Sequence, residues 1–167
     1  RRHTSDVYLA VVDKLRAARP DIAMSGDFIV GFPGETDRDF AQTLQLVSQV
    51  GYASAYSFKY SSRPGTPAAT SEDQVAEEVK TERLESLQQL LNAQRFAFNK
   101  ATEGQVVEIL VERAGGRAGQ MAGRSPYMQA VNFVGDESQI GQILPCKLCA
   151  ARQNSMTGEI LTIKGAA

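Results

Sequence analysis

The residues best suited to contact a ligand lie in the segment Asp27–Thr36, where an apolar run ends in a glycine-containing turn. A helix start follows the turn. In a β/α barrel, such a turn lies at the carboxyl ends of the strands, where ligands bind. Gly31 and Gly34 allow the backbone to come close to a bound molecule. Asp27 stands in a strand that we expect to be buried, so its carboxylate is either a site residue or a paired structural one.

A second group of candidate residues lies in Gly123–Val131. Arg124 can pair with a phosphate, and Tyr127 can stack on an unstacked base. Ser125 and Gln129 can hydrogen-bond a base or a ribose. On composition alone, the alternative is an ordinary barrel with a solvated arginine and a turn tyrosine.

The charge balance sets a condition on any binding of RNA. Residues 101–167 carry six Lys+Arg and six Asp+Glu. This part of the chain is therefore neutral, and RNA binding requires its basic side chains to cluster on one face. The basic residues that would extend a patch around Arg124 are Arg113, Arg117, Lys147 and Arg152.

The two cysteines, Cys146 and Cys149, form a Cys-x-x-Cys pair. Such a pair can be half of a zinc site, but the only histidine, His3, is far away in the sequence. We therefore interpret them as small structural thiols and expect no metal ligand and no catalytic residue in this chain. Two cysteines give no disulfide framework, which favours a reducing cytoplasm.

The composition is that of a folded protein, with 43% hydrophobic and 22% charged residues among 167 and a net charge of −1. Apolar residues are spread along the chain, which excludes disorder. No apolar run approaches the roughly 18–20 residues of a membrane span, so we expect no membrane partner. The polar start shows no signal peptide. We expect a monomer.

The first hundred residues alternate helices and strands. Thr4 is a suitable N-cap and Pro20 a stop, while Thr36 and Asp39 resemble a capping box closed by Gly51. The expected helices are Thr4–Pro20, Thr36–Gly51 and about Gln74–Lys100, and the expected strands are Ile22–Gly31 and Ala53–Tyr60. This order predicts parallel strands joined by right-handed crossovers.

Two parallel strands cannot bury both of their faces alone. The first hundred residues are therefore predicted to be part of a larger β/α barrel. On the long helix, a leucine stripe is expected to pack on the barrel, and a charged face is expected to be solvated. That charged face comprises Glu77, Glu78, Lys80, Glu82, Arg83 and Glu85.

After Gly104 the pattern changes to short strands separated by Gly, Asp, Asn and Ser. Five such strands in so short a segment predict a small closed or partly open barrel of the size of an OB-fold. The expected strands are Gln105–Arg113, Gln120–Gly123, Gln129–Val134, Ile143–Ala150 and Glu159–Ile163.

Long contiguous runs of this chain resemble the radical-SAM methylthiotransferase family. Asp27–Thr36 resembles the fifth strand and turn of that family's barrel, and Phe58–Ala68 its sixth strand and following loop. Arg1–Thr4 looks like the end of the segment after the fourth strand. Gly123–Val131 resembles the central hairpin of the TRAM domain, an RNA-binding barrel.

The resemblance implies an α/β part followed by an all-β part. Residues 1–100 would be the C-terminal part of a radical-SAM (β/α) barrel, and residues 101–167 a small, five-stranded, OB-like TRAM β-barrel. It also implies S-adenosyl-L-methionine as cofactor, lying across the rim of the barrel. The residues expected at the cofactor are Arg1, Asp27, Gly31, Phe32, Pro33 and Arg63.

The family's chemistry further implies two [4Fe–4S] clusters. One of them needs a Cys-x-x-x-Cys-x-x-Cys triad, whose three thiolates leave one iron open for the cofactor. Since this chain has no such triad, its resemblance implies that the cluster ligands lie outside it and that the chain is inactive alone.

The hairpin also indicates the substrate class. The run from Arg124 to Val131 looks like that of the family's enzymes that act on isopentenyladenosine in tRNA. These convert the base next to the anticodon to its 2-methylthio derivative, and the β-domain would bind the tRNA anticodon arm through Arg124, Ser125, Tyr127 and Gln129. The alternatives are relatives that modify threonylcarbamoyl-adenosine or a ribosomal protein, and a non-catalytic RNA-binding module.

Overall fold

The computed structural model of the chain describes residues 3–161. The chain divides into two compact units between Gln94 and Arg95. Each unit has its own hydrophobic core. Among the described residues, no helix is both long and apolar enough to cross a membrane.

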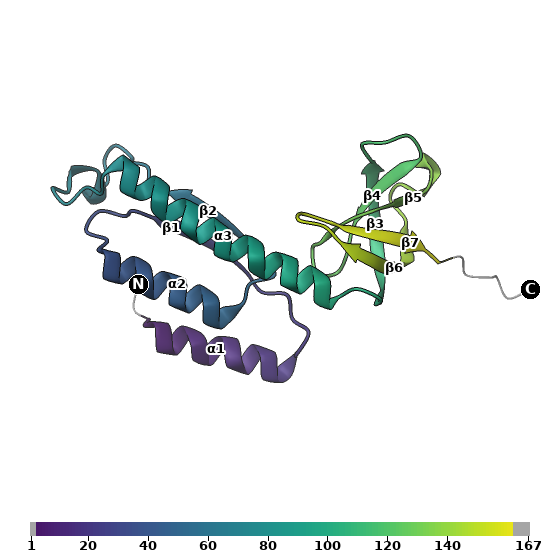
Figure 1. The fold of residues 1–167 in the computed structure, drawn as a ribbon, viewed down its shortest axis with the longest axis horizontal. Helices are drawn as coiled ribbons and strands as arrows, with labels where there is room; N and C mark the ends of the chain where they lie inside the picture. Colours follow the sequence, from purple (N-terminus) through teal and green to yellow (C-terminus); the bar gives the residue numbers. More distant parts are fainter. Residues whose placement is uncertain (1–2, 162–167) are drawn as a thin grey trace, which may run out of the picture. The chain divides into compact units, whose positions relative to one another are not determined.

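The first unit alternates helices and strands, as the sequence predicts (Figure 1). Its strands are parallel, and their register runs from Ser25 beside Ser54 to Val30 beside Lys59. The elements are α1 (Ser5–Ala18), β1 (Ser25–Val30), α2 (Asp37–Val50), β2 (Ser54–Lys59), the short 3-10 helix η1 (Pro67–Thr70) and α3 (Glu77–Ala101).

Local capping fixes the ends of the first two helices. The backbone N–H of Val7 donates to Thr4 Oγ1, and Thr36 and Asp39 form a complete capping box at the start of α2. Gly51 ends α2 with a φ of 60°, a left-handed conformation that glycine adopts without strain. These three predictions from the sequence are confirmed.

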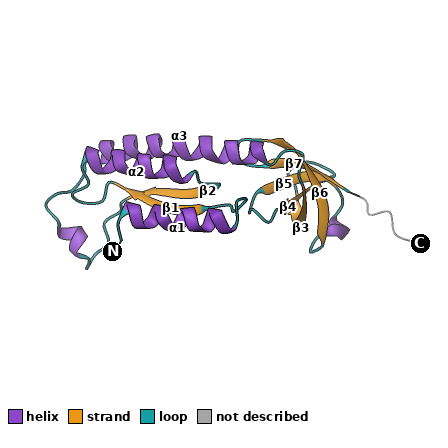
Figure 2. Ribbon diagram, turned by 90° about the horizontal axis from the view of Figure 1, so that it is seen from below, coloured by secondary structure: helices purple, strands orange, loops and turns teal. Residues whose placement is uncertain are grey.

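One face of the sheet carries the core of the first unit. Figure 2 shows α2 and α3 on one side of the two strands, and α1 packs beside α2 (Figure 1). Burial of these apolar side chains is the main favourable term in holding helices and sheet together. The fully buried members of the core are Val12, Val30, Val47, Val50, Tyr52, Leu87 and Leu91.

The opposite face of the same sheet is apolar and open in the described part of the chain. Ile29 and Phe58 are register partners and are 61% and 55% exposed, and the neighbouring Tyr56 is 70% exposed. A free face this rich in aromatic side chains is typical of a sheet that belongs to a larger layer. The structure thus agrees with the prediction of a partial β/α barrel.

The second unit is a closed barrel with the strand order β3-β4-β5-β7-β6. Its core is formed by alternate side chains that point inward, among them Ile109, Val131 and Leu148. The barrel predicted from the sequence is therefore closed rather than partly open. Its strands are β3 (Val106–Ala114), β4 (Gln120–Arg124), β5 (Ala130–Val134), β6 (Ile143–Ala151) and β7 (Met156–Ile160), with a short 3-10 helix η2 (Glu137–Gln139) before β6.

The last strand begins three residues earlier than Glu159, where the sequence pattern placed it. Met156 is fully buried in the barrel core, so pairing starts there. Gly158 resembles a turn residue in the sequence, but it is needed within the strand, because a Cβ at this position would lie 2.4 Å from Cys146 Sγ. Residues 162 and 163 of the predicted strand lie outside the described residues.

The boundary between the two compact units falls inside α3, between Gln94 and Arg95. The reason is that the last turns of this helix contact the barrel. Phe98 packs against Tyr127, and Asn99 accepts a hydrogen bond from Gln129. The end of α3 is therefore part of the second unit.

Candidate functional site

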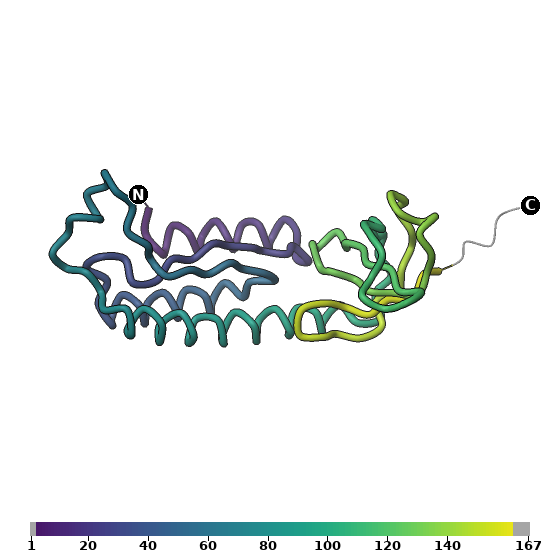
Figure 3. Tube along the Cα trace, turned by 90° about the horizontal axis from the view of Figure 1, so that it is seen from above, coloured from purple at the N-terminus to yellow at the C-terminus, as the bar shows by residue number. Residues whose placement is uncertain are grey.

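The first candidate site lies at the carboxyl ends of β1 and β2. Because these strands are parallel, the loops that follow them leave from the same end of the sheet (Figure 3). A hollow of about 870 Å³ opens there. It is lined by Ile29, Phe32, Phe58, Lys59, Tyr60, Ser61, Arg63, Thr66, Pro67 and Ala68.

This rim hollow has aromatic and aliphatic walls with one arginine at its edge. The rings of Phe32 and Tyr60 meet edge to face at 5.2 Å, which fixes one wall. Arg63 belongs to the loop after β2 and is exposed. The structure thus brings together two of the predicted cofactor residues, Phe32 and Arg63, from different loops.

Gly31 shapes the turn beside this hollow without lining it. Its φ is +72°, and a Cβ there would lie 2.1 Å from Lys80 Cγ, so only glycine fits. The N–H of Gly31 donates to Glu35 Oε1 at 3.0 Å. Pro33 lies in the same turn, half-buried, and also stands outside the lining of the rim hollow.

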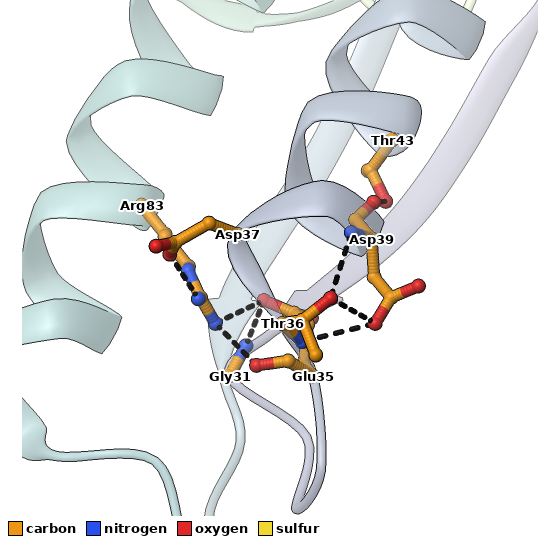
Figure 4. Close-up of polar contacts among 7 residues, drawn as sticks. All are labelled: Gly31, Glu35, Thr36, Asp37, Asp39, Thr43 and Arg83. Carbon is orange, nitrogen blue, oxygen red and sulfur yellow. Dashed lines mark hydrogen bonds and ion pairs between the residues drawn. The ribbon is translucent and has the colours of Figure 1, made fainter.

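A buried arginine of α3 holds this turn in place (Figure 4). Arg83 is only 6% exposed, and its Nη1 donates to the backbone oxygen and to Oε1 of Glu35, at 3.1 and 2.9 Å. Its Nη2 donates to Asp37 Oδ1 at 2.7 Å. Glu35 accepts from Gly31 on the same Oε1, so one carboxylate links helix, turn and glycine.

The prediction of a solvated charged face on α3 is therefore wrong for Arg83. The sequence held a signal: Arg83 lies four and eight residues before Leu87 and Leu91, which are both buried. Residues at this spacing share one face of a helix. An arginine on the same helix face as buried leucines is expected to point inward and to be paired with an acidic group.

Asp27 is not the buried carboxylate that the sequence suggested. It points to the open face of the sheet beside Tyr56 and is exposed. Among residues 3–161 its carboxylate has no hydrogen-bond or ion-pair partner, whereas its backbone belongs to the β1–β2 pairing. It lines a smaller hollow of about 370 Å³ together with His3 and Tyr8, away from Arg63. The other predicted cofactor residue, Arg1, lies outside the described residues.

The second candidate site is the turn between β4 and β5, in the barrel. Arg124 stands at its start and pairs with Glu112 over distances of 3.2 and 3.3 Å, and it is about two-fifths exposed. The half-buried Tyr127 packs edge to face on Phe98 of α3 at 5.7 Å. Both side chains sit where a ligand can reach them. Met128, at the tip, is 66% exposed and has a φ of 62°, a conformation that costs non-glycine residues energy.

Ser125 and Gln129 are placed differently from the prediction that they hydrogen-bond RNA. Both are buried, at 3% and 8% exposed, and their side chains bond to each other. Gln129 Nε2 also donates to Asn99 and Thr102. A polar side chain is buried when its hydrogen bonds are met inside the protein. These two residues therefore hold the turn and do not face outward from it.

The basic side chains divide between the two ends of the barrel. Arg113 and Arg117 belong to the hairpin before β4, whereas Arg124 ends that strand. The starts of β5 and β7 lie side by side, which brings Arg152, in the turn before β7, to the end that carries Arg124. The four residues predicted to extend the patch thus do not all surround Arg124. Lys147 lies on the barrel wall as the register partner of Glu159.

The two cysteines of the barrel lie in different environments. Cys146 is buried in the core, and burial raises the pKa of its thiol to about 11. Cys149 is exposed. In the part of the chain that the structure describes, no group of three His, Cys, Asp or Glu side chains is arranged to hold a metal ion.

The barrel that carries the second site matches a known domain family. The TRAM domain model covers residues 100–161, the segment that forms all five strands. Residues 100–161 are a TRAM domain. The Arg124–Gln129 turn is thus a part of a TRAM domain, and α3 supplies side chains from just before the matched region.

The chain as a whole is similar to a tRNA-modifying enzyme. It is 56% identical over 160 residues to the tRNA-2-methylthio-N(6)-dimethylallyladenosine synthase of Novosphingobium aromaticivorans. The alignment covers 96% of this chain, and the chain spans only 36% of the length of that relative. The similarity includes both units, the partial barrel and the TRAM domain.

Proposed function

We propose that this chain is the C-terminal portion of a radical-SAM tRNA methylthiotransferase. The whole enzyme would convert N6-isopentenyladenosine next to the anticodon to its 2-methylthio derivative. The observation that carries the proposal is the 56% identity, which extends over 96% of the chain to a synthase named for this product. The proposal places the enzyme in the cytoplasm, with its tRNA substrate, as a monomer.

The rim hollow suits S-adenosyl-L-methionine as cofactor. Its aromatic and aliphatic walls match the adenine and the aliphatic part of the methionine chain, and the guanidinium of Arg63 matches the carboxylate of the methionine part. When bound, the cofactor supplies the radical and methyl chemistry of the family. Phe32 and Arg63 would contact it, while Gly31 and Pro33 shape the turn and Asp27 lies in the neighbouring hollow.

The described residues do not fit an iron–sulfur cluster. A cluster needs several cysteine thiolates, whereas one of the two cysteines here is sealed in the TRAM core. We therefore assign no step to this chain through either cluster of the family. The chain's own tasks would be to orient the cofactor, to exclude water at the rim and to bind tRNA.

The TRAM domain would bind the anticodon arm through the Arg124–Gln129 turn. Arg124 would exchange its exposed pairing with Glu112 for an RNA phosphate, since such surface ion pairs are weak. Tyr127 would offer the exposed part of its ring to an unstacked base. In this form of the proposal, Ser125 and Gln129 do not contact RNA themselves but hold the turn that carries Arg124 and Tyr127.

The decisive experiment is mass spectrometry of tRNA from cells that lack the gene encoding this chain. The expected result is loss of 2-methylthio-isopentenyladenosine with accumulation of isopentenyladenosine. The gene carrying Arg63→Ala should restore the modification less well than the unaltered gene. An unchanged level of the methylthio nucleoside in the deletion strain would refute the proposal. Loss of a threonylcarbamoyl-type or ribosomal-protein modification instead would identify another substrate, and light scattering checks the monomer.

A further inference from the structure

A cluster of buried polar side chains lies behind the β4–β5 turn of the TRAM domain. It combines Asn99 of α3 and Thr102, just after that helix, with residues of the turn itself. Gln129 Nε2 donates to Asn99 Oδ1 and to Thr102 Oγ1, each at 2.9 Å. Gln129 Oε1 accepts from Ser125 Oγ at 3.0 Å. Each of the four residues is less than a tenth exposed.

The cluster reaches the backbone of the turn through a single hydroxyl. Ser125 Oγ accepts from the N–H groups of Tyr127 and Gln129, both at 3.2 Å. The turn is also closed by the N–H of Ser125, which donates to the Gln129 carbonyl at 3.0 Å. A second backbone bond runs from the N–H of Met128 to the Ser125 carbonyl at 2.9 Å. Four side chains and these two backbone bonds thus fix the five residues 125–129, Met128 in its left-handed conformation among them.

The two residues that we propose for RNA binding depend on this arrangement. Arg124 Nη1 donates to the carbonyl of Met128, so the strained tip supports the arginine. Tyr127 lies on Phe98, one residue before Asn99, so the ring and the cluster share a turn of α3. Two buried amides and two buried hydroxyls are costly unless all are satisfied. Apolar side chains would fill this space without needing any hydrogen-bond partner.

We propose that Asn99, Thr102, Ser125 and Gln129 are positioning residues that preset the Arg124–Met128 turn for RNA. Their effect is to fix Arg124 and Tyr127 before RNA arrives, so that binding does not have to order the turn. The inference rests on the proposed function, since it assumes that this turn contacts RNA. It adds that Phe98 and Asn99 of α3, which lie outside the matched TRAM region, help to build the RNA site.

The test compares RNA affinity with stability in the full chain. Gln129→Met keeps the volume of the side chain and removes its hydrogen bonds, and Ser125→Ala is a milder second variant. Phe133→Leu, at the far end of β5, is the control that weakens the barrel core without touching the turn. The probe is an anticodon stem-loop RNA that contains adenosine next to the anticodon, with dissociation constants measured at several salt concentrations well below each unfolding midpoint.

We expect Gln129→Met and Ser125→Ala to weaken RNA binding by about tenfold, because misplacing Arg124 and Tyr127 costs about as much affinity as losing one contact. Both should flatten the salt dependence by about one ion, the same change that we expect of Arg124→Ala, because the arginine no longer meets its phosphate. Phe133→Leu should lower the unfolding midpoint and leave affinity and salt slope unchanged. Faster amide exchange at Tyr127 and Gln129 in Ser125→Ala would report the loosened turn directly.

The outcomes separate the two ideas. If Arg124→Ala weakens binding while both cluster variants bind like the unaltered chain, the cluster is structural only and the inference fails. If the control loses affinity in proportion to stability, as the cluster variants do, the inference fails as well. If Arg124→Ala and Tyr127→Ala both bind normally, the turn is not the RNA site and the proposed role of the TRAM domain fails with it.

Discussion

Replacing Arg83 by methionine should destabilise the first unit more than any other change to a charged residue of α3. Methionine matches the length of the aliphatic stem but removes three hydrogen bonds, two to Glu35 and one to Asp37. The Glu35 carboxylate, mostly buried, would keep only the N–H of Gly31 as partner. Removing one member of a buried pair leaves an uncompensated charge and typically costs about 3–5 kcal/mol.

Two structural details place the expected cost near the lower end of that range. Asp37 is almost fully exposed, so its bond to Arg83 adds little. The retained bond from Gly31 partly satisfies Glu35. We therefore expect a loss of about 3 kcal/mol in the free energy of unfolding of the first unit. Glu35→Gln keeps a side-chain oxygen for Gly31 and should cost only about 1–2 kcal/mol.

Urea unfolding followed by far-UV circular dichroism measures these losses, with Glu82→Met on α3 as a matched control. Arg83→Met combined with Glu35→Gln should cost less than the sum of the two single changes, because no charge is then left buried. A loss below about 1 kcal/mol for Arg83→Met would refute the reasoning, since it is the value of an exposed ion pair. Additive losses in the double variant would show that the two side chains do not act as a pair.

Three further predictions concern single residues. Met128→Gly should stabilise the TRAM domain by up to about 1 kcal/mol in a denaturant titration, because glycine adopts the positive φ without strain and the methionine is mostly exposed; a clear loss of stability would mean that the side chain makes a contact of its own. Hydrogen bonds from Lys59 and Lys80 lower the pKa of Glu77 to about 2. Its stabilising contribution is therefore complete above its ordinary pKa near 4.5 and is lost as the pH falls toward 2. Glu77→Gln should accordingly make thermal unfolding less sensitive to acid in this window, and an unchanged acid sensitivity would contradict the pairing. In alkylation followed by mass spectrometry, exposed Cys149 should react at neutral pH while buried Cys146, with its pKa raised to about 11, stays unmodified until unfolding; equal rates would contradict the closed barrel core.

The secondary structure of this chain was largely predictable because its signals are local. Thr4, Thr36 and Gly51 mark helix ends by their own chemistry, whatever packs around them. The alternation of helix and strand likewise predicts the parallel pairing of β1 and β2. The last strand escaped the pattern because Gly158 lies within it for a tertiary reason, the close approach of Cys146.

The candidate sites were less predictable, since burial decides what a polar residue can do. Ser125 and Gln129 look like an RNA-contacting pair in the sequence, but they bond to each other, and Gln129 also bonds to Asn99 of α3, far away in the sequence. Arg83 was predicted to be solvated because charged residues surround it in the sequence, and Asp27 was predicted to be buried because its neighbours are apolar. In each case the residue type was informative, but whether the side chain points inward or outward depends on contacts between elements far apart in the sequence.

The placement of the α3 terminus has a practical consequence for anyone who excises the barrel for study. A fragment cut at residue 100, where the domain match begins, would retain Gln129 and discard Asn99 and Phe98. The Gln129 amide would then keep Thr102 and Ser125 but lose its bond to Asn99, and Tyr127 would lose its contact with the Phe98 ring. Recombinant fragments should instead begin before Arg95, so that enough of α3 is present to keep its C-terminal turns helical. Domain limits drawn from alignments would otherwise yield a barrel whose Arg124–Gln129 turn has lost part of its support from α3.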